Sequence, residues 1–221
     1  MTVNPARLVV PAPSKPSKSA GPGLHPLGLG GDRDGLLYVP DTAGALPLLL
    51  VLHGATMQAR QMARPLLAAA DDHGVVLLVP DSRRETWDVL LGNFGPDVEF
   101  VNSALAAALD RCEIDTTRLG LAGVSDGASY ALSLGLANGD TFASVIALSP
   151  GFVAPPALVG KPRVFLTHGI RDPILPIDTC GRPIAAGLHN SGYEIDYREF
   201  DGGHEMPEPL VRAAFGWFVE A

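Results

Sequence analysis

The sequence is poor in cysteine and has no long apolar run, and each shortage excludes a class of protein. Its 221 residues include two cysteines, Cys112 and Cys180, too few for a disulfide framework or a cysteine-based zinc site. No window approaches the roughly 18 apolar residues that a membrane-spanning helix needs. Prolines interrupt the N-terminal segment, which lacks the basic and apolar regions of a signal peptide. We therefore expect a cytoplasmic protein with no membrane span and no metal site.

The charge of the chain is acidic and unevenly distributed. The net charge of the chain is −8. Residues 1–31 contain three basic residues and no acidic one, so they carry +3 and residues 32–221 carry −11. An acidic surface repels the phosphate backbone of nucleic acids, which argues against a nucleic-acid partner. The sequence leaves the oligomeric state open.

The chain has the length and apolar content of one catalytic domain. Apolar residues make up 47% of the sequence, enough for one substantial core. Residues 1–23 are rich in proline, serine and lysine, which is typical of a tail or a strap lying over a domain. We therefore place the domain boundary after residue 30 and the catalytic domain at residues 31–221.

Apolar runs typical of buried strands alternate along the chain with segments of helical periodicity. Strands are predicted at residues 36–39, 46–52, 75–79, 119–124, 143–148, 164–167 and 193–200, and helices at 58–73, 97–111, 126–137, 178–191 and 207–219. This alternation predicts an α/β fold with a mostly parallel sheet and helices on both faces. Ligands of such sheets bind beyond the carboxyl ends of the strands, so we searched there for catalytic residues.

A G-x-S-x-G motif follows one of these predicted strands. Gly123-Val124-Ser125-Asp126-Gly127 stands between an apolar strand and a predicted helix, the setting of a nucleophile elbow. The tight turn requires small neighbours, which explains the two glycines, and it would raise the Ser125 hydroxyl above the sheet. The motif alone is weak, and the alternative is an ordinary glycine-rich turn with a capping serine.

The general base is predicted to be a histidine, because its ordinary pKa lies near neutral pH. Three of the six histidines follow predicted strands: His53, His168 and His204. Only His204 lies downstream of an acid that also follows a strand, so we assign it as the base. The alternative is that His204 is an ordinary loop histidine.

The acid that orients this histidine is predicted to be Asp172. It follows the strand that ends at residue 167, whereas Asp178 is better explained as a helix N-cap and Asp201 lies only three residues before His204. The resulting order of serine, aspartate and histidine is the order of α/β-hydrolases.

An oxyanion hole needs two hydrogen-bond donors, since the loss of one typically costs about 2.7–4 kcal/mol of transition-state stabilisation. One predicted donor is the backbone N–H of Asp126, directly after the nucleophile. The second is the N–H of Ala55, in the loop after the strand that ends at Leu52, with Thr56 as the substitute.

These motifs together resemble the carboxylesterase/phospholipase and dienelactone-hydrolase-like branch of the α/β-hydrolases. The resemblance covers roughly residues 35–221 and implies an eight-stranded fold, no cofactor and hydrolysis of esters or thioesters through an acyl-enzyme. It rests on Leu52-His53-Gly54-Ala55, Gly123 to Ser129, His168-Gly169-Ile170-Arg171-Asp172 and Gly203-His204.

The site is expected to be open. The fifteen residues 149–163 are too few for a helical cap domain, which favours short to medium acyl groups. We therefore expect a serine esterase acting on a small ester. Two alternatives remain: a thioesterase or lysophospholipase with the same triad, and a non-enzymatic binding protein that retains the fold. The predicted substrate-binding residues are Thr56, Trp87, Phe152 and Ile174, although Trp87 is equally well explained as a residue that packs its loop onto the core.

Overall fold

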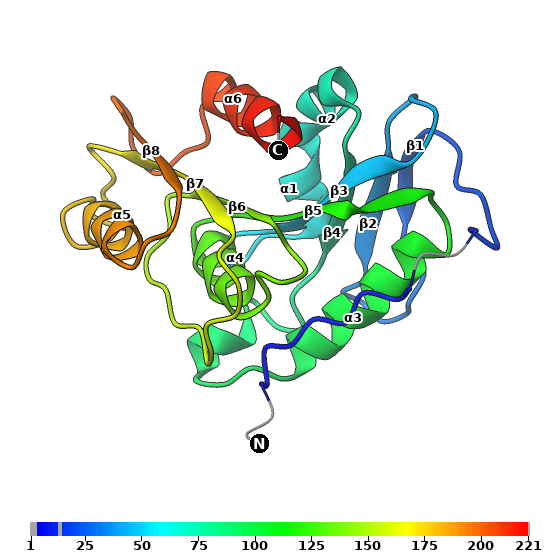
Figure 1. Ribbon diagram of the computed structural model, residues 1–221, viewed down its shortest axis with the longest axis horizontal. Helices are drawn as coiled ribbons and strands as arrows, with labels where there is room; N and C mark the ends of the chain where they lie inside the picture. The colour runs from blue at the N-terminus through cyan, green and yellow to red at the C-terminus, as the bar shows by residue number, and fades with distance from the viewer. Residues whose placement is uncertain (1–3, 13–14, 221) are drawn as a thin grey trace.

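The protein is built around one eight-stranded sheet (Figure 1). The computed structural model describes residues 4–12 and 15–220. Six strands run parallel, and β2 is antiparallel to both of its neighbours, β1 and β4. In spatial order the strands are β1 (Gly23–Pro26), β2 (Gly35–Val39), β4 (Val76–Pro80), β3 (Leu46–Leu52), β5 (Ile114–Val124), β6 (Ser144–Leu148), β7 (Arg163–Gly169) and β8 (Ile195–Phe200).

Helices cover both faces of the sheet, as the alternating pattern predicts. One face is covered by α1 (Ala59–Ala63), α2 (Leu67–His73) and α6 (Glu208–Val219), and the other by α3 (Pro96–Leu109), α4 (Asp126–Ala137) and α5 (Gly181–Asn190) (Figure 1). Strand β3 shows why both faces are apolar: Leu48 and Leu50 face the second group of helices, while Leu49 faces the first. A strand buried on both faces needs this continuous apolar run.

The predicted helix at residues 58–73 is wrong as a single helix. It consists of α1, a short 3-10 helix η1 (Arg64–Leu66) and α2. Pro65 lies inside η1 and has no backbone N–H to donate, so a continuous α-helical hydrogen-bond ladder cannot pass through it. A second 3-10 helix, η2 (Asp88–Leu91), lies in the connection between β4 and α3.

The proline-rich N-terminal segment lies over the domain as a strap. Ala6 and Leu8 are buried in the core, and the Asn138 side chain donates to Ala6 O at 2.7 Å and accepts from Leu8 N at 2.8 Å. Residues 23–26 go further and form β1 at the edge of the sheet, which the sequence does not predict. Residues 1–3 and 13–14 of the expected strap lie outside the described residues.

No helix or strand interrupts residues 149–162, the connection from β6 to β7. The prediction of a fold without a cap domain at this position therefore agrees with the structure. Within residues 4–12 and 15–220, no helix is both long and apolar enough to cross a bilayer.

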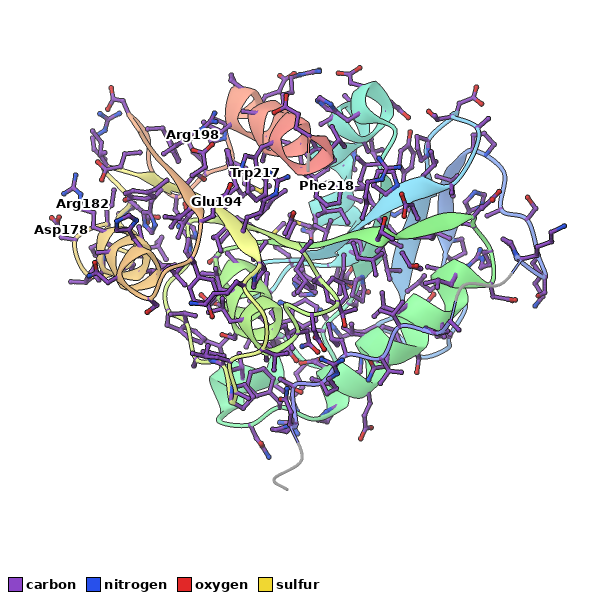
Figure 2. The ribbon with its side chains drawn as sticks, viewed as in Figure 1. Asp178, Arg182, Glu194, Arg198, Trp217 and Phe218 are labelled. Carbon is purple, nitrogen blue, oxygen red and sulfur yellow. The ribbon has the colours of Figure 1, made fainter. Side chains whose placement is uncertain are left out.

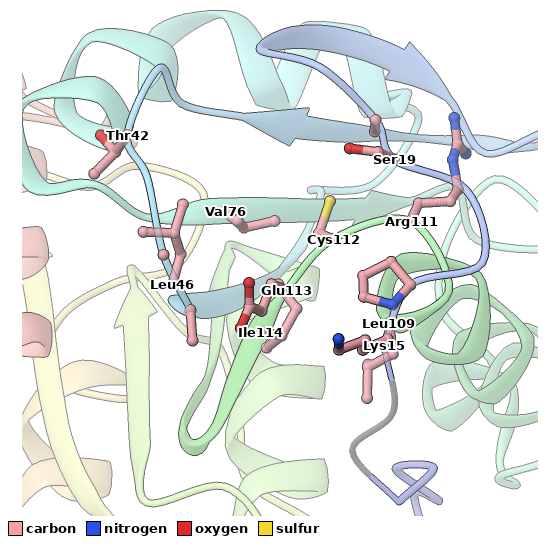
Figure 3. A pocket seen from close by; sticks show the side chains of 14 residues that line it. Lys15, Ser19, Thr42, Leu46, Val76, Leu109, Arg111, Cys112, Glu113 and Ile114 are labelled. Carbon is pink, nitrogen blue, oxygen red and sulfur yellow. The ribbon is translucent and has the colours of Figure 1, made fainter.

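A cavity of about 660 Å³ lies at the opposite edge of the sheet from the carboxyl ends of its strands (Figure 3). Its walls include Leu46, Val76 and Ile114, at or near the first residues of β3, β4 and β5. Burial raises the pKa of the Cys112 thiol, which also lines it, to about 11. This cavity is separate from the predicted catalytic residues, which follow the other ends of the strands.

Candidate active site

Ser125 lies in a strained turn between β5 and α4. Its backbone has φ 56° and ψ −122°, a conformation that non-glycine residues rarely adopt. A Cβ at Gly123 would lie 2.2 Å from Gly127 O, and a Cβ at Gly127 would lie 2.1 Å from Leu52 O. Side chains are therefore sterically excluded on both sides of the serine, which is the physical reason for the two glycines of the motif.

Asp172 and His204 lie together beyond the carboxyl ends of the neighbouring strands β7 and β8. His204 Nδ1 donates to Asp172 Oδ2 at 2.6 Å, and the Asp172 side chain is buried. The other carboxylate oxygen accepts the backbone N–H groups of Ile174 and Leu175, each at 2.9 Å. The carboxylate is thus fixed in place with one oxygen directed at the imidazole.

The environment of Asp172 keeps it ionised. Burial by itself would raise its pKa, but hydrogen bonds from Leu175 N–H, His204 and Ile174 N–H outweigh burial and lower the pKa below its ordinary value. An ionised acceptor selects the His204 tautomer with the proton on Nδ1. That tautomer leaves Nε2 unprotonated and able to accept a proton.

The two competing carboxylates are engaged elsewhere. Asp178 is exposed and pairs with Arg182 at 2.5 Å on the outer side of the molecule (Figure 2). The sequence predicts Asp178 as the N-cap of helix α5, and that prediction is wrong. The helix begins at Gly181, with Cys180 as its cap. Asp201 is exposed and pairs with Arg171.

A second histidine, His168, lies beside Asp172, a contact that the sequence does not predict. His168 is completely buried, with Nε2 3.4 Å from Asp172 Oδ2 and 2.7 Å from Leu175 O. Its Nδ1 has no hydrogen-bond partner among the described residues. The signal in the sequence is His168-Gly169 at the end of β7.

The predicted oxyanion-hole residues lie on both sides of the serine turn. Gly54 is close to Ser125, since a Cβ at Gly54 would lie 3.5 Å from Ser125 Cβ. In the described part of the chain, neither Ala55 N–H nor Asp126 N–H donates to any group. Thr56 N–H, the substitute donor, is already bound to Glu85 O at 2.7 Å, so it is not free for an oxyanion.

The predicted substrate-binding residues differ in exposure. Trp87 is completely buried, with Nε1 donating to His53 O at 2.8 Å and its ring stacked on Tyr130, so it packs the loop onto the core and presents no surface to a ligand. Ile174 is 65% exposed beside the acid, and Phe152 is half-buried. Thr56 is exposed, with a left-handed backbone at φ 63°.

The Ser125 hydroxyl and His204 Nε2 each have no hydrogen-bond partner within the described residues. In unliganded hydrolases the bond between these groups is often long and tightens when substrate binds. In residues 4–12 and 15–220 there is also no cluster of three histidine, cysteine or acidic side chains suited to a metal ion. The arrangement provides the groups for acyl transfer by a serine, a base and a carboxylate.

Comparison with known proteins gives one curated relative and many structural neighbours. No family model matches the chain. A protein named "Putative esterase NocK", from Nocardia uniformis subsp. tsuyamanensis, is 32% identical over 143 residues, which cover 60% of this chain. The matched region covers 42% of that relative, so the likeness concerns less than half of the longer protein.

Several solved esterase structures share the fold. Esterase PE8 superposes with a TM-score of 0.69 at 19% identity, over 84% of this chain and 97% of its own. A truncated carbohydrate esterase from gut microbiota has a TM-score of 0.70 at 15% identity, over 94% and 98%. The Bacillus cereus carboxylesterase has a TM-score of 0.64 at 20% identity, over 83% and 92%. At these identities the similarity shows a common fold.

Proposed function

We propose that this chain, which has the α/β-hydrolase fold, is a serine esterase with Ser125 as nucleophile, His204 as general base and Asp172 as the orienting acid. The observation that supports this assignment best is the 2.6 Å hydrogen bond from His204 Nδ1 to a buried carboxylate, at the sheet edge where Ser125 occupies its strained turn. The curated relative named as an esterase supports the same activity.

The proposed reaction proceeds through an acyl-enzyme. Ser125 Oγ attacks the ester carbonyl while His204 Nε2 takes its proton, and Asp172 stabilises the imidazolium that forms. The N–H groups of Ala55 and Asp126 hold the oxyanion. His204 then protonates the leaving alcohol, and the same ring activates the water that releases the acid.

The proposed substrates are esters of short to medium acyl groups. The connection between β6 and β7 contains no helix that would close over the site, so the reacting groups are reached without a lid. Ile174 and Phe152 are the apolar side chains that we propose to contact the substrate, because they follow β7 and β6, the next two strands on one side of β5, and retain exposed surface. We expect activity to fall as the acyl chain outgrows these two contacts.

The test is hydrolysis of short p-nitrophenyl esters by the wild type and by Ser125→Ala. We expect Ser125→Ala to lose turnover and labelling by a fluorophosphonate probe while it remains folded. Ser103→Ala is the matched control, because Ser103 is an exposed helix residue whose hydroxyl bonds only to Glu99 O. Undiminished hydrolysis by Ser125→Ala would overturn the assignment of the nucleophile. Higher wild-type rates with acyl-CoA or lysophospholipid than with simple esters would instead identify a thioesterase or a lysophospholipase.

A further inference from the structure

The loop that follows β3 is held by hydrogen bonds with three residues from other parts of the chain. We call residues 53–57 the oxyanion loop. Trp87 Nε1 binds His53 O at 2.8 Å, and Arg33 binds Met57 O at 3.1 Å. Glu85 O accepts from Thr56 N at 2.7 Å. Every one of these partners lies outside the loop, so its backbone has little freedom to rotate.

His53 holds the centre of this loop. It is completely buried, its Nδ1 lies 2.7 Å from Gly54 O, and its Nε2 accepts from Ser82 N at 3.0 Å. Arg33 reaches the same nitrogen, with Nη2 3.3 Å from Nε2. His53 thus connects the loop to two groups that are distant in the sequence.

The neighbours of His53 determine its tautomer. Ser82 N–H and the guanidinium of Arg33 are donors only, so Nε2 must be unprotonated. The proton is therefore on Nδ1, where it donates to Gly54 O, which can only accept. Burial is the largest influence on the pKa of His53 and lowers it; the Arg33 guanidinium acts in the same direction, while the bond to Gly54 O and the carboxylates of Asp81 and Asp126 oppose it without reversing the direction.

This bond determines the direction of one peptide group. In a trans peptide the carbonyl oxygen and the following N–H point to opposite sides, and there are no cis peptides among the described residues. Because Gly54 O is turned toward His53 Nδ1 and Met57 N, the N–H of Ala55 is turned away from them. Ala55 is an exposed residue whose N–H has no partner among the described residues, and Gly54, directly before it, lies beside the turn that holds Ser125.

We propose that His53, held as its Nδ1–H tautomer by Ser82 N–H and Arg33, is a positioning residue that aims the Ala55 N–H at the oxyanion. The inference rests on the proposed esterase function, since it concerns the transition state of that reaction. His53 does not touch the substrate. Its effect is on how well the oxyanion is bound, and hence on turnover rather than on substrate affinity.

The first test compares His53→Asn with His53→Gln. The asparagine amide places an N–H near the position of Nδ1 and retains the bond to Gly54 O. The glutamine amide reaches the position of Nε2 and loses that bond. We expect His53→Gln to lower kcat about 10- to 100-fold, because small misplacements of a catalytic group have effects of this size. His53→Asn should stay within about threefold of the wild type, and KM should change little in both.

A trifluoromethyl ketone analogue of the substrate supplies a readout that a purely structural role would not change. It forms a tetrahedral oxyanion on Ser125, so its inhibition constant should rise in His53→Gln by the same factor as kcat falls. Equal losses in both variants, or a loss confined to KM, would overturn the inference. If the wild type hydrolyses no ester and is not labelled by fluorophosphonate, the proposed function itself has failed.

A second measurement uses the wild type and does not depend on folded variants. Nitrogen-15 NMR of histidine-labelled protein reports the tautomer of each ring. We expect His53 in the wild type to show a protonated Nδ1 and an unprotonated Nε2 at neutral pH. A ring that carries its proton on Nε2 at that pH would refute the assigned tautomer and with it the proposal.

Discussion

The orientation of His204 by Asp172 leads to a sharp prediction for Asp172→Asn. In the wild type one carboxylate oxygen accepts two backbone N–H groups, and the other accepts His204 Nδ1–H. In the variant, the amide oxygen keeps the two backbone bonds, so the NH₂ group faces His204. A donor at that position forces Nδ1 to accept, and the proton moves to Nε2.

An imidazole protonated on Nε2 cannot take the proton of Ser125. Loss of the correct tautomer costs about 10⁴-fold in kcat in serine hydrolases, which is about 5.4 kcal/mol of transition-state stabilisation. The retained bonds to Ile174 and Leu175 should keep the loop in place, so the effect on the free energy of unfolding should stay below about 3 kcal/mol. The variant is therefore expected to be folded and nearly inactive.

The assay is kcat for a short p-nitrophenyl ester, with circular dichroism to confirm folding. Asp178→Asn is the matched control: that carboxylate also precedes α5 but is exposed and pairs with Arg182, and we expect its loss to change kcat by less than about twofold. The reasoning would be refuted if folded Asp172→Asn kept more than a tenth of wild-type activity, or if Asp178→Asn lost as much.

Three further predictions concern stability and reactivity. Burial raises the pKa of Asp97 to about 6, so the folded state binds the carboxyl proton more tightly than the unfolded state does. The free energy of unfolding should therefore fall as pH rises from about 4 to 6. Asp97→Asn should remove up to about 3 kcal/mol of that fall, as measured by urea titrations at each pH. Gly127→Ala should destabilise by about 3 kcal/mol or more, because its Cβ meets backbone atoms, whereas Gly187→Ala, in an open helical position, should be neutral or stabilising in thermal melts. Burial raises the pKa of the Cys112 thiol to about 11, which leaves little of the reactive thiolate at pH 8. Cys112 should therefore react with a disulfide reagent roughly 100-fold more slowly in the folded protein than in urea-unfolded protein. Equal rates would contradict the burial of this thiol.

Most of the fold and the pairing of acid and base could be predicted from the sequence, because their signals are local. Buried parallel strands require continuous apolar runs, and each of the predicted catalytic residues lies within four residues of the carboxyl end of a strand. Asp172 and His204 are distant in the chain, but they follow adjacent parallel strands, so their side chains meet at one edge. Their assigned catalytic roles stay predictions, as do the cytoplasmic location and the absence of a nucleic-acid partner.

What could not be predicted depends on contacts between distant segments. The sequence predicts Trp87 as a substrate-binding residue. In the structure its indole N–H donates to the carbonyl oxygen of His53, and its ring stacks on Tyr130. Arg33 follows a glycine-rich turn and has no local sign of a role, yet it binds the end of β3 and the loop after β4. Strand β1 contains glycine and proline and depends on its pairing with β2.

The strap has a consequence for how the chain is made. Leu8 is hydrogen-bonded to Asn138, 130 residues later. At about 5–20 residues per second, a ribosome needs roughly 7 to 26 seconds to synthesise the intervening chain. Throughout that interval Ala6 and Leu8 lack their burial site. The segment that holds these two residues therefore cannot dock until Asn138 has been synthesised, and a fluorophore attached near Leu8 would report that docking during translation.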